Sequence, residues 1–175
     1  MARPGANWRS LVRDVQDFPV PGILFKDIAP VLADPGGLAA VAAELTAAAR
    51  AFSPDVVVAV EARGFILGAP IALALGVGFV PVRKPGKLPF PTRSVAYALE
   101  YGETVLHMHT DALHPGARAV IVDDVLATGG TLAATAQLVA EAGATAVGAV
   151  VALEIAGLGG RGRLADLALT SLEGV

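Results

Sequence analysis

The chain has 175 residues and a formal net charge of −3, with 54% apolar and 17% charged residues. Because globular proteins average about 45–50% apolar and about 25% charged residues, this composition excludes a disordered chain, and the net negative charge argues against a nucleic-acid partner. The absence of cysteine excludes disulfide scaffolds, thiol nucleophiles and thiolate metal sites, and it favours a reducing compartment, so we expect a cytoplasmic protein.

The first predicted elements are a capped helix and a buried strand. Residues 1–8 lack the apolar core of a secretory signal. Asp34 is expected to cap a helix with Pro35 in its first turn, because apolar residues follow at helical spacing over 38–52. The β-branched run Val56–Val60 then predicts a strand that is buried on both faces.

The longest uncharged stretch runs from Gly64 to Val82 and is long enough to cross a bilayer. It is interrupted by four glycines and two prolines, however, and its pattern changes from helical to strand-like near Leu75. We therefore expect a buried helix up to about Leu75 and a strand over 76–82, with no membrane partner.

Residues 83–103 interrupt the alternation of helices and strands with a basic loop that is rich in proline and glycine. Residues 95–99 and 104–109 are expected to pair as an antiparallel hairpin. Loops of this length inside a domain are more often functional than not, so we interpret 83–103 as a flexible loop. A solvated basic loop is the alternative.

The last third alternates again, with a strand over 120–122, a helix over about 131–142 and a strand over 147–153. Strand–helix alternation predicts an α/β fold in which a mostly parallel central sheet is flanked by helices. We see no second domain, and we interpret residues 1–175 as a single one.

The strongest motif is Val-Ile-Val-Asp-Asp-Val-Leu-Ala-Thr-Gly-Gly-Thr over residues 120–131. Ligands of parallel sheets bind beyond the carboxyl ends of the strands, and the backbone N–H groups of a glycine-rich loop at a helix start can bind a phosphate. Asp123 and Asp124 can accept hydrogen bonds from a sugar diol or help to position Mg²⁺ held by phosphates. The structural alternative is a capped turn.

This motif resembles the phosphoribosyl-diphosphate motif of the type I phosphoribosyltransferases. Segments 18–28, 61–65, 83–89 and 99–102 are similar to the members of that family that act on adenine, and the resemblance extends from about Phe18 to Leu164. It implies the type I fold, with a small hood formed mainly by 18–30 and around 155–164. It also implies purine salvage, in which adenine and phosphoribosyl diphosphate give AMP and diphosphate with Mg²⁺ carried by the substrate.

The resemblance assigns each candidate residue a role. The loop expected to bind the 5′-phosphate consists of Ala127, Thr128, Gly129, Gly130 and Thr131, and the residues expected to bind the diphosphate are Arg63, Arg83 and Lys87. The residues expected to bind adenine are Leu24, Phe25, Lys26 and Leu158. The expected catalytic residues are Glu100, Asp123 and Asp124, with Tyr101 in an accessory role. Arg83 is expected to reach the site of a neighbouring subunit, which implies a homodimer. Lys26 stands where some relatives have arginine, so its contact with the base is an open question.

Each of these side chains also has a structural alternative. Arg63 can form an ion pair with Glu61, Phe25 and Leu158 can pack in the core, and Glu100 can shape its loop by hydrogen bonding. His107, His109 and His114 are interpreted as strand-edge or solvent-facing groups. A transferase for a 6-oxopurine such as xanthine is the alternative function, followed by a ligand-sensing regulator on the same fold.

Overall fold

The structure is a computed structural model that describes residues 7–18, 21–22, 24–98 and 103–175. The chain divides into two units, residues 1–44 and residues 45–175. The expected single domain, with a hood drawn from 18–30 and 155–164, remains a prediction.

The first unit contains a short antiparallel hairpin. A 3₁₀ helix, η1 (Trp8–Leu11), precedes β1 (Arg13–Gln16), which pairs with β2 (Leu24–Asp27), and α1 (Ala29–Ala33) follows. Two ion pairs cross the hairpin, Arg13 with Asp27 at 2.5 Å and Lys26 with Asp14 at 2.8 Å. The hairpin was not predicted.

Helix α2 (Pro35–Arg50) begins in the first unit and ends in the second. The Asp34 carboxylate accepts a hydrogen bond of 2.7 Å from the backbone N–H of Gly37, so the predicted cap is confirmed. The helix ends at Arg50, two residues before the predicted end at Phe52.

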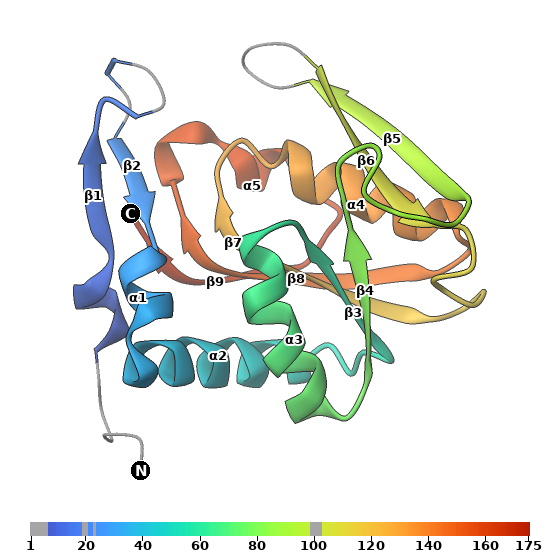
Figure 1. Ribbon diagram of the computed structural model, residues 1–175, viewed down its shortest axis with the longest axis horizontal. Coiled ribbons are helices and arrows are strands. Elements are labelled where there is room, and N and C mark those ends of the chain that lie inside the picture. The colour runs from blue at the N-terminus through green and yellow to red at the C-terminus, as the bar shows by residue number, and fades with distance from the viewer. Residues whose placement is uncertain (1–6, 19–20, 23, 99–102) are drawn as a thin grey trace. The chain divides into compact units, whose positions relative to one another are not determined.

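A five-stranded parallel sheet forms the centre of the second unit, in the order β4-β3-β7-β8-β9. Its strands are β3 (Val56–Val60), β4 (Gly78–Val82), β7 (Arg118–Leu126), β8 (Thr145–Glu154) and β9 (Leu169–Gly174). The predicted parallel α/β fold is confirmed (Figure 1). β7 is longer than predicted because it continues through both aspartates.

Helices cover both faces of this sheet. On one face, α3 (Arg63–Leu75) packs against β3, where Gly68 lies close to the side chains of Ala59 and Val57. On the other face, alternate β3 residues such as Val58 join one apolar cluster with Leu138 of α4 (Gly130–Glu141). β3 is therefore buried on both faces, as its unbroken apolar run predicts.

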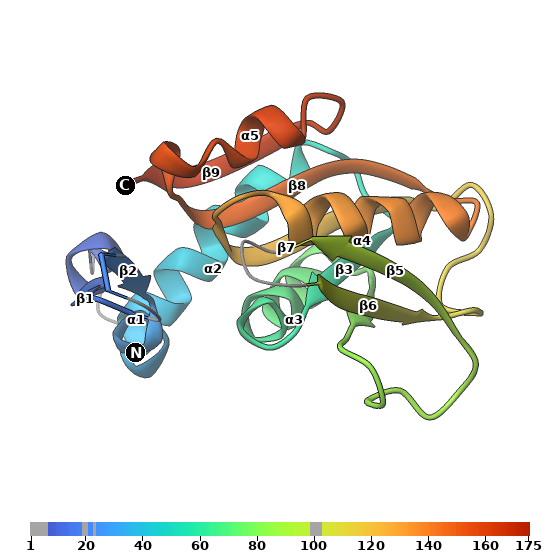
Figure 2. The same ribbon diagram turned by 90° about the horizontal axis from the view of Figure 1, so that it is seen from above.

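The expected hairpin is also confirmed. β5 (Thr92–Ala98) pairs with β6 (Glu103–His109) and lies alongside α4 in both views (Figures 1 and 2). Backbone hydrogen bonds between Arg83 and His107 join β6 to the end of β4.

The uncharged stretch 64–82 forms α3 and β4, as predicted. In the described part of the chain, no helix has the length and hydropathy that a membrane crossing requires.

Candidate active site

The carboxyl ends of two neighbouring strands, β3 and β7, bring Arg63 together with Asp123 and Asp124. β3 and β7 pair in parallel, with Ala59 opposite Val122, so both strands end at the same edge of the sheet. Arg63 begins α3 immediately after β3, and Asp123 and Asp124 lie near the end of β7. Sequence-distant Arg63 and Asp124 form an ion pair across this edge.

The two aspartates are buried, with 9% of Asp123 and 5% of Asp124 exposed. An Asp123 carboxylate oxygen accepts a hydrogen bond of 2.9 Å from the backbone N–H of Asp124. Burial raises the pKa of Asp123 well above its ordinary value, and the adjacent negative charge of Asp124 raises that pKa further. The ionised form of Asp123 is therefore stabilised by a positive charge placed beside it.

The start of α3 lies directly against this pair. A Cβ atom on Gly64 would lie 2.9 Å from the backbone oxygen of Val122 and 3.2 Å from an oxygen of Asp123. Only glycine leaves room for so close an approach, and this approach places Arg63 beside the carboxylates.

A glycine-rich loop follows β7 and opens α4. Gly129 has a φ of +79°, which is the left-handed region that favours glycine. Loop residues Ala127 and Thr128 are half-buried, and α4 begins at Gly130. The first N–H groups of a helix have no acceptor within the helix, so this end of α4 suits an anion.

A second glycine, Gly160, packs against this loop from the start of α5 (Gly160–Arg163). A Cβ atom on Gly160 would lie 2.1 Å from the Ala127 carbonyl oxygen and 3.0 Å from the Gly129 nitrogen. Sequence reasoning missed Gly160. The available signal was the Gly159-Gly160 pair, which follows the carboxyl end of a buried strand.

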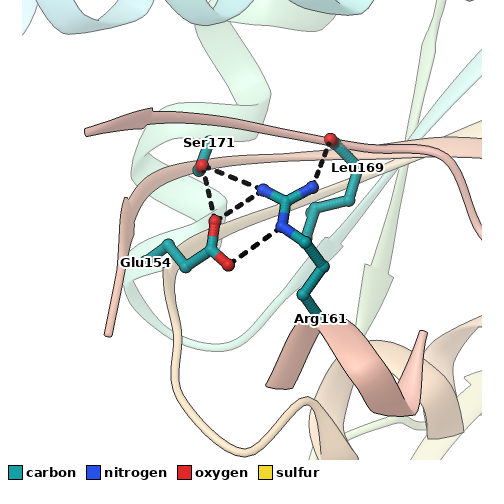
Figure 3. Close-up of polar contacts among 4 residues, drawn as sticks. All are labelled: Glu154, Arg161, Leu169 and Ser171. Carbon is teal, nitrogen blue, oxygen red and sulfur yellow. Dashed lines mark hydrogen bonds and ion pairs between the residues drawn. The ribbon is translucent and has the colours of Figure 1, made fainter. Parts of the chain in front are cut away.

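A charged network holds α5 in place (Figure 3). Arg161 contacts both carboxylate oxygens of Glu154, at 2.5 and 3.0 Å, and the Leu169 carbonyl oxygen at 3.2 Å. The Ser171 hydroxyl donates to Glu154 at 2.7 Å. These bonds lower the pKa of Glu154 and tie α5 to β8 and β9.

Two further side chains lie against the first residue of α4. A Cβ atom on Gly130 would lie 2.9 Å from a ring carbon of Tyr97 on β5 and 3.1 Å from a guanidinium nitrogen of Arg163. The Tyr97 hydroxyl is 3.0 Å from the hydroxyl of Thr131. Neither Tyr97 nor Arg163 was predicted, because only the fold brings these segments to the loop.

The basic loop is partly held by its own chain. The Arg83 guanidinium contacts Glu61 at 2.9 Å and the Lys87 carbonyl oxygen at 3.2 Å, and the backbone N–H of Lys84 donates to Glu61 at 3.2 Å. Glu61, considered above as a partner for Arg63, is thus bound by Arg83. The side chain of Lys87 is exposed.

The predicted adenine residues fall in both units. In the first, Leu24 is 41% exposed, Phe25 meets Phe18 edge-on with ring centroids 5.1 Å apart, and Lys26 pairs with Asp14. In the second, Leu158 ends the 3₁₀ helix η2 (Ala156–Leu158) and is 40% exposed. Glu100 and Tyr101 lie outside the described residues.

The carboxylate pair is also the group best suited to Mg²⁺. Within the described ranges, no three His, Cys, Asp or Glu side chains are placed to hold a metal ion. Two adjacent carboxylates nevertheless fit an Mg²⁺ that brings phosphate oxygens and water as its other ligands. Among the histidines, His107 contacts Thr92 at 2.9 Å, and His109 meets the Phe90 ring.

Comparison with known proteins identifies relatives over nearly the whole chain. A family model described as "Phosphoribosyl transferase domain" matches residues 31–168. The chain is 56% identical over 167 residues to the adenine phosphoribosyltransferase of Nocardioides sp. strain JS614, which covers 93% of this chain and 90% of that protein.

Solved structures give the same result. The adenine phosphoribosyltransferase of Thermoanaerobacter pseudethanolicus matches with a TM-score of 0.93 and 47% identity, covering 95% of this chain and 97% of that one. That of Saccharomyces cerevisiae, solved with D-2,5-dideoxy-2,5-imino-altritol 1,6-bisphosphate and adenine, matches with a TM-score of 0.88 and 37% identity, over 94% of this chain and 96% of that one.

Proposed function

The chain belongs to the adenine phosphoribosyltransferases, enzymes of purine salvage, and we propose that it carries out this transfer at the carboxyl ends of β3 and β7. The reaction moves the 5-phosphoribosyl group from phosphoribosyl diphosphate to N9 of adenine and yields AMP and diphosphate. The observation that supports this location best is the buried pair Asp123 and Asp124, which lies beside Arg63 and runs directly into the glycine-rich loop.

The 5′-phosphate is bound by the loop Ala127–Thr131. The left-handed Gly129 turns the chain at the amino end of α4, where the first N–H groups and the dipole of the helix favour a dianion. Gly160 supports the loop from below through close backbone contact. The loop thereby fixes one end of the sugar.

Asp123 and Asp124 bind the ribose hydroxyls and stabilise the positive charge that develops at the reacting carbon of the ribose. Cleavage of the bond to diphosphate builds positive charge on the ribose ring, as in glycoside chemistry. Because burial makes the ionised form of Asp123 unfavourable, its carboxylate gains most when that positive charge develops beside it. An interaction that strengthens in the transition state raises the rate.

The departing diphosphate is bound by Arg63 and Lys87, together with Arg83 of the second subunit of a homodimer. Arg63 lies at the amino end of α3, its side chain is 40% exposed, and a guanidinium binds phosphate in a bidentate manner. Asp123 and Asp124 would hold an Mg²⁺ that arrives with the substrate, and this ion would neutralise charge on the diphosphate.

The residues proposed to bind adenine are Leu24, Phe25 and Lys26 of the hood segment 18–30, and Leu158. The Phe25 ring offers an apolar face to the purine, and Lys26 is held in place by Asp14. Glu100 accepts the proton that adenine gives up, and Tyr101 assists it.

The absence of cysteine is consistent with a protein that functions in the reducing cytoplasm.

A base competition assay tests the proposed function. The protein is offered equal amounts of adenine, hypoxanthine, guanine and xanthine with phosphoribosyl diphosphate and Mg²⁺, and the nucleotides formed are separated. AMP is the expected product. Formation of a 6-oxopurine nucleotide without AMP would support the alternative transferase and contradict the assignment.

A further inference from the structure

We propose that Tyr97 is a positioning residue that aims the hydroxyl proton of Thr131 at the 5′-phosphate. This inference rests on the proposed binding of that phosphate by Ala127–Thr131. Tyr97 belongs to β5 and Thr131 to the first turn of α4, so the contact joins two elements that are distant in sequence.

The geometry of the contact is specific. The two hydroxyl oxygens are 3.0 Å apart, which is a hydrogen-bond distance. The Tyr97 ring reaches this place because Gly130 has no side chain: a Cβ there would lie 2.9 and 3.3 Å from two carbons of the ring. The ring itself packs against the apolar cluster between the sheet and α4, which holds the tyrosine hydroxyl in position.

The direction of the hydrogen bond follows from the ligand. A threonine hydroxyl has one proton and can accept two hydrogen bonds. A phosphate dianion has no proton to give, so Thr131 must donate to it. With its only proton given to phosphate, Thr131 accepts from Tyr97. The tyrosine therefore supports the hydroxyl orientation that the bound phosphate needs.

The same arrangement explains why two neighbouring residues of the loop are glycine. Gly129 supplies the turn through its positive φ, whereas Gly130 supplies the space that Tyr97 occupies. Tyr97 is thus coupled to the loop by both shape and hydrogen bonding. Removal of its hydroxyl leaves the ring packing intact and isolates the hydrogen bond.

The test is a double-mutant cycle of Tyr97→Phe and Thr131→Val, in which KM for phosphoribosyl diphosphate, KM for adenine, kcat and melting temperature are measured. Tyr97→Phe is expected to raise KM for phosphoribosyl diphosphate about 3- to 10-fold, the range for one hydrogen bond, and to leave KM for adenine unchanged. In the Thr131→Val background Tyr97→Phe is expected to have no further effect. Thr131→Ser keeps the hydroxyl and is expected to restore the sensitivity to Tyr97→Phe.

The outcomes separate this inference from the proposed function. If Thr131→Val raises KM for phosphoribosyl diphosphate while Tyr97→Phe does not, the positioning role is wrong and the phosphate loop stands. Additive effects of the two substitutions would also overturn the positioning role, because Tyr97 would then act through another group. If Thr131→Val itself leaves this KM unchanged, the proposed use of Thr131 fails.

Discussion

At the scale of single residues, Asp123 of the proposed catalytic pair illustrates how one buried carboxylate can lower the stability of the fold. Its pKa is raised in the folded state by burial and by Asp124, above an ordinary value of 3.8. Below pH 3.8 the carboxyl is protonated in both the folded and the unfolded chain, so ionisation has no effect on stability. As the pH rises from 3.8 through the folded-state pKa, the unfolded chain ionises first, and the free energy of unfolding falls.

Asp123→Asn is therefore expected to stabilise the protein near neutral pH while it reduces activity. Each unit of pKa elevation corresponds to about 1.4 kcal/mol, and about 1 kcal/mol changes the melting temperature of a chain of this size by about 2–4 °C. We expect the variant to melt at a higher temperature than the wild type at pH 8 and to lose this advantage towards pH 4. Calorimetric melting across this pH range measures the effect.

Asp166→Asn is the matched control, because Asp166 is exposed and its replacement is expected to leave the melting temperature unchanged. An Asp123→Asn protein that melts at or below the wild-type temperature at pH 8 would show that the buried charge is not destabilising.

At the scale of elements, the glycine-rich loop after β7 depends on α5, to which no chemistry is assigned. The Arg161 network ties α5 to β8 and β9, and Gly160 then meets Ala127 and Gly129 without a side chain between them. The position of the loop is thus set by a segment about thirty residues further along the chain.

Gly160→Ala is expected to displace the loop, because its Cβ would overlap the Ala127 carbonyl oxygen. Since misplacement by about 1 Å can cost about 100-fold, kcat/KM for phosphoribosyl diphosphate should fall by about that factor. Gly162→Ala lies in the same short helix with nothing within 4 Å of the new Cβ, so it should retain activity. Steady-state kinetics of both variants test this prediction. Equal losses of kcat/KM in the two variants would contradict it and would indicate a general effect on α5.

The elements that sequence reasoning predicted are those with a strong local pattern. The unbroken Val56–Val60 run and the glycine loop after Asp124 each fix one structure by themselves. By contrast, β1, β2 and β9 are short or half-exposed and have mixed polar and apolar residues. Such strands are defined by their partners across the sheet, which a single sequence does not reveal.

The same division holds for the site. The places of Asp123 and Asp124 near the end of β7, and of Gly129 at the start of α4, could be predicted because these residues lie in one continuous strand–loop–helix motif. Tyr97 and Gly160 could not, because they reach the loop only through the packing of β5 and α5. The alternative partner weighed for Arg63 was the nearby Glu61, whereas parallel pairing of β3 with β7 brings it to Asp124.

At the scale of the whole molecule, the proposed homodimer gives Arg83 a role in the partner's site. Within its own chain Arg83 contacts Glu61, and it would have to break this contact to reach the site of the partner subunit. Arg83→Ala and Asp124→Ala are each expected to lose activity as homodimers. A dimer of one chain of each kind has one intact site, so co-expression should restore about a quarter of the wild-type activity by random pairing. Activity that stays at the level of the single variants would place Arg83 in its own chain's site.

The most direct test of the account is the rate of AMP formation by Asp124→Ala, measured beside wild type and Asp166→Ala under saturating adenine, phosphoribosyl diphosphate and Mg²⁺. If the carboxylate pair stabilises the ribosyl transition state, kcat should fall about 100- to 1,000-fold, as for other single electrostatic contacts, while Asp166→Ala retains wild-type activity. Wild-type AMP synthesis by Asp124→Ala would contradict the role of the pair.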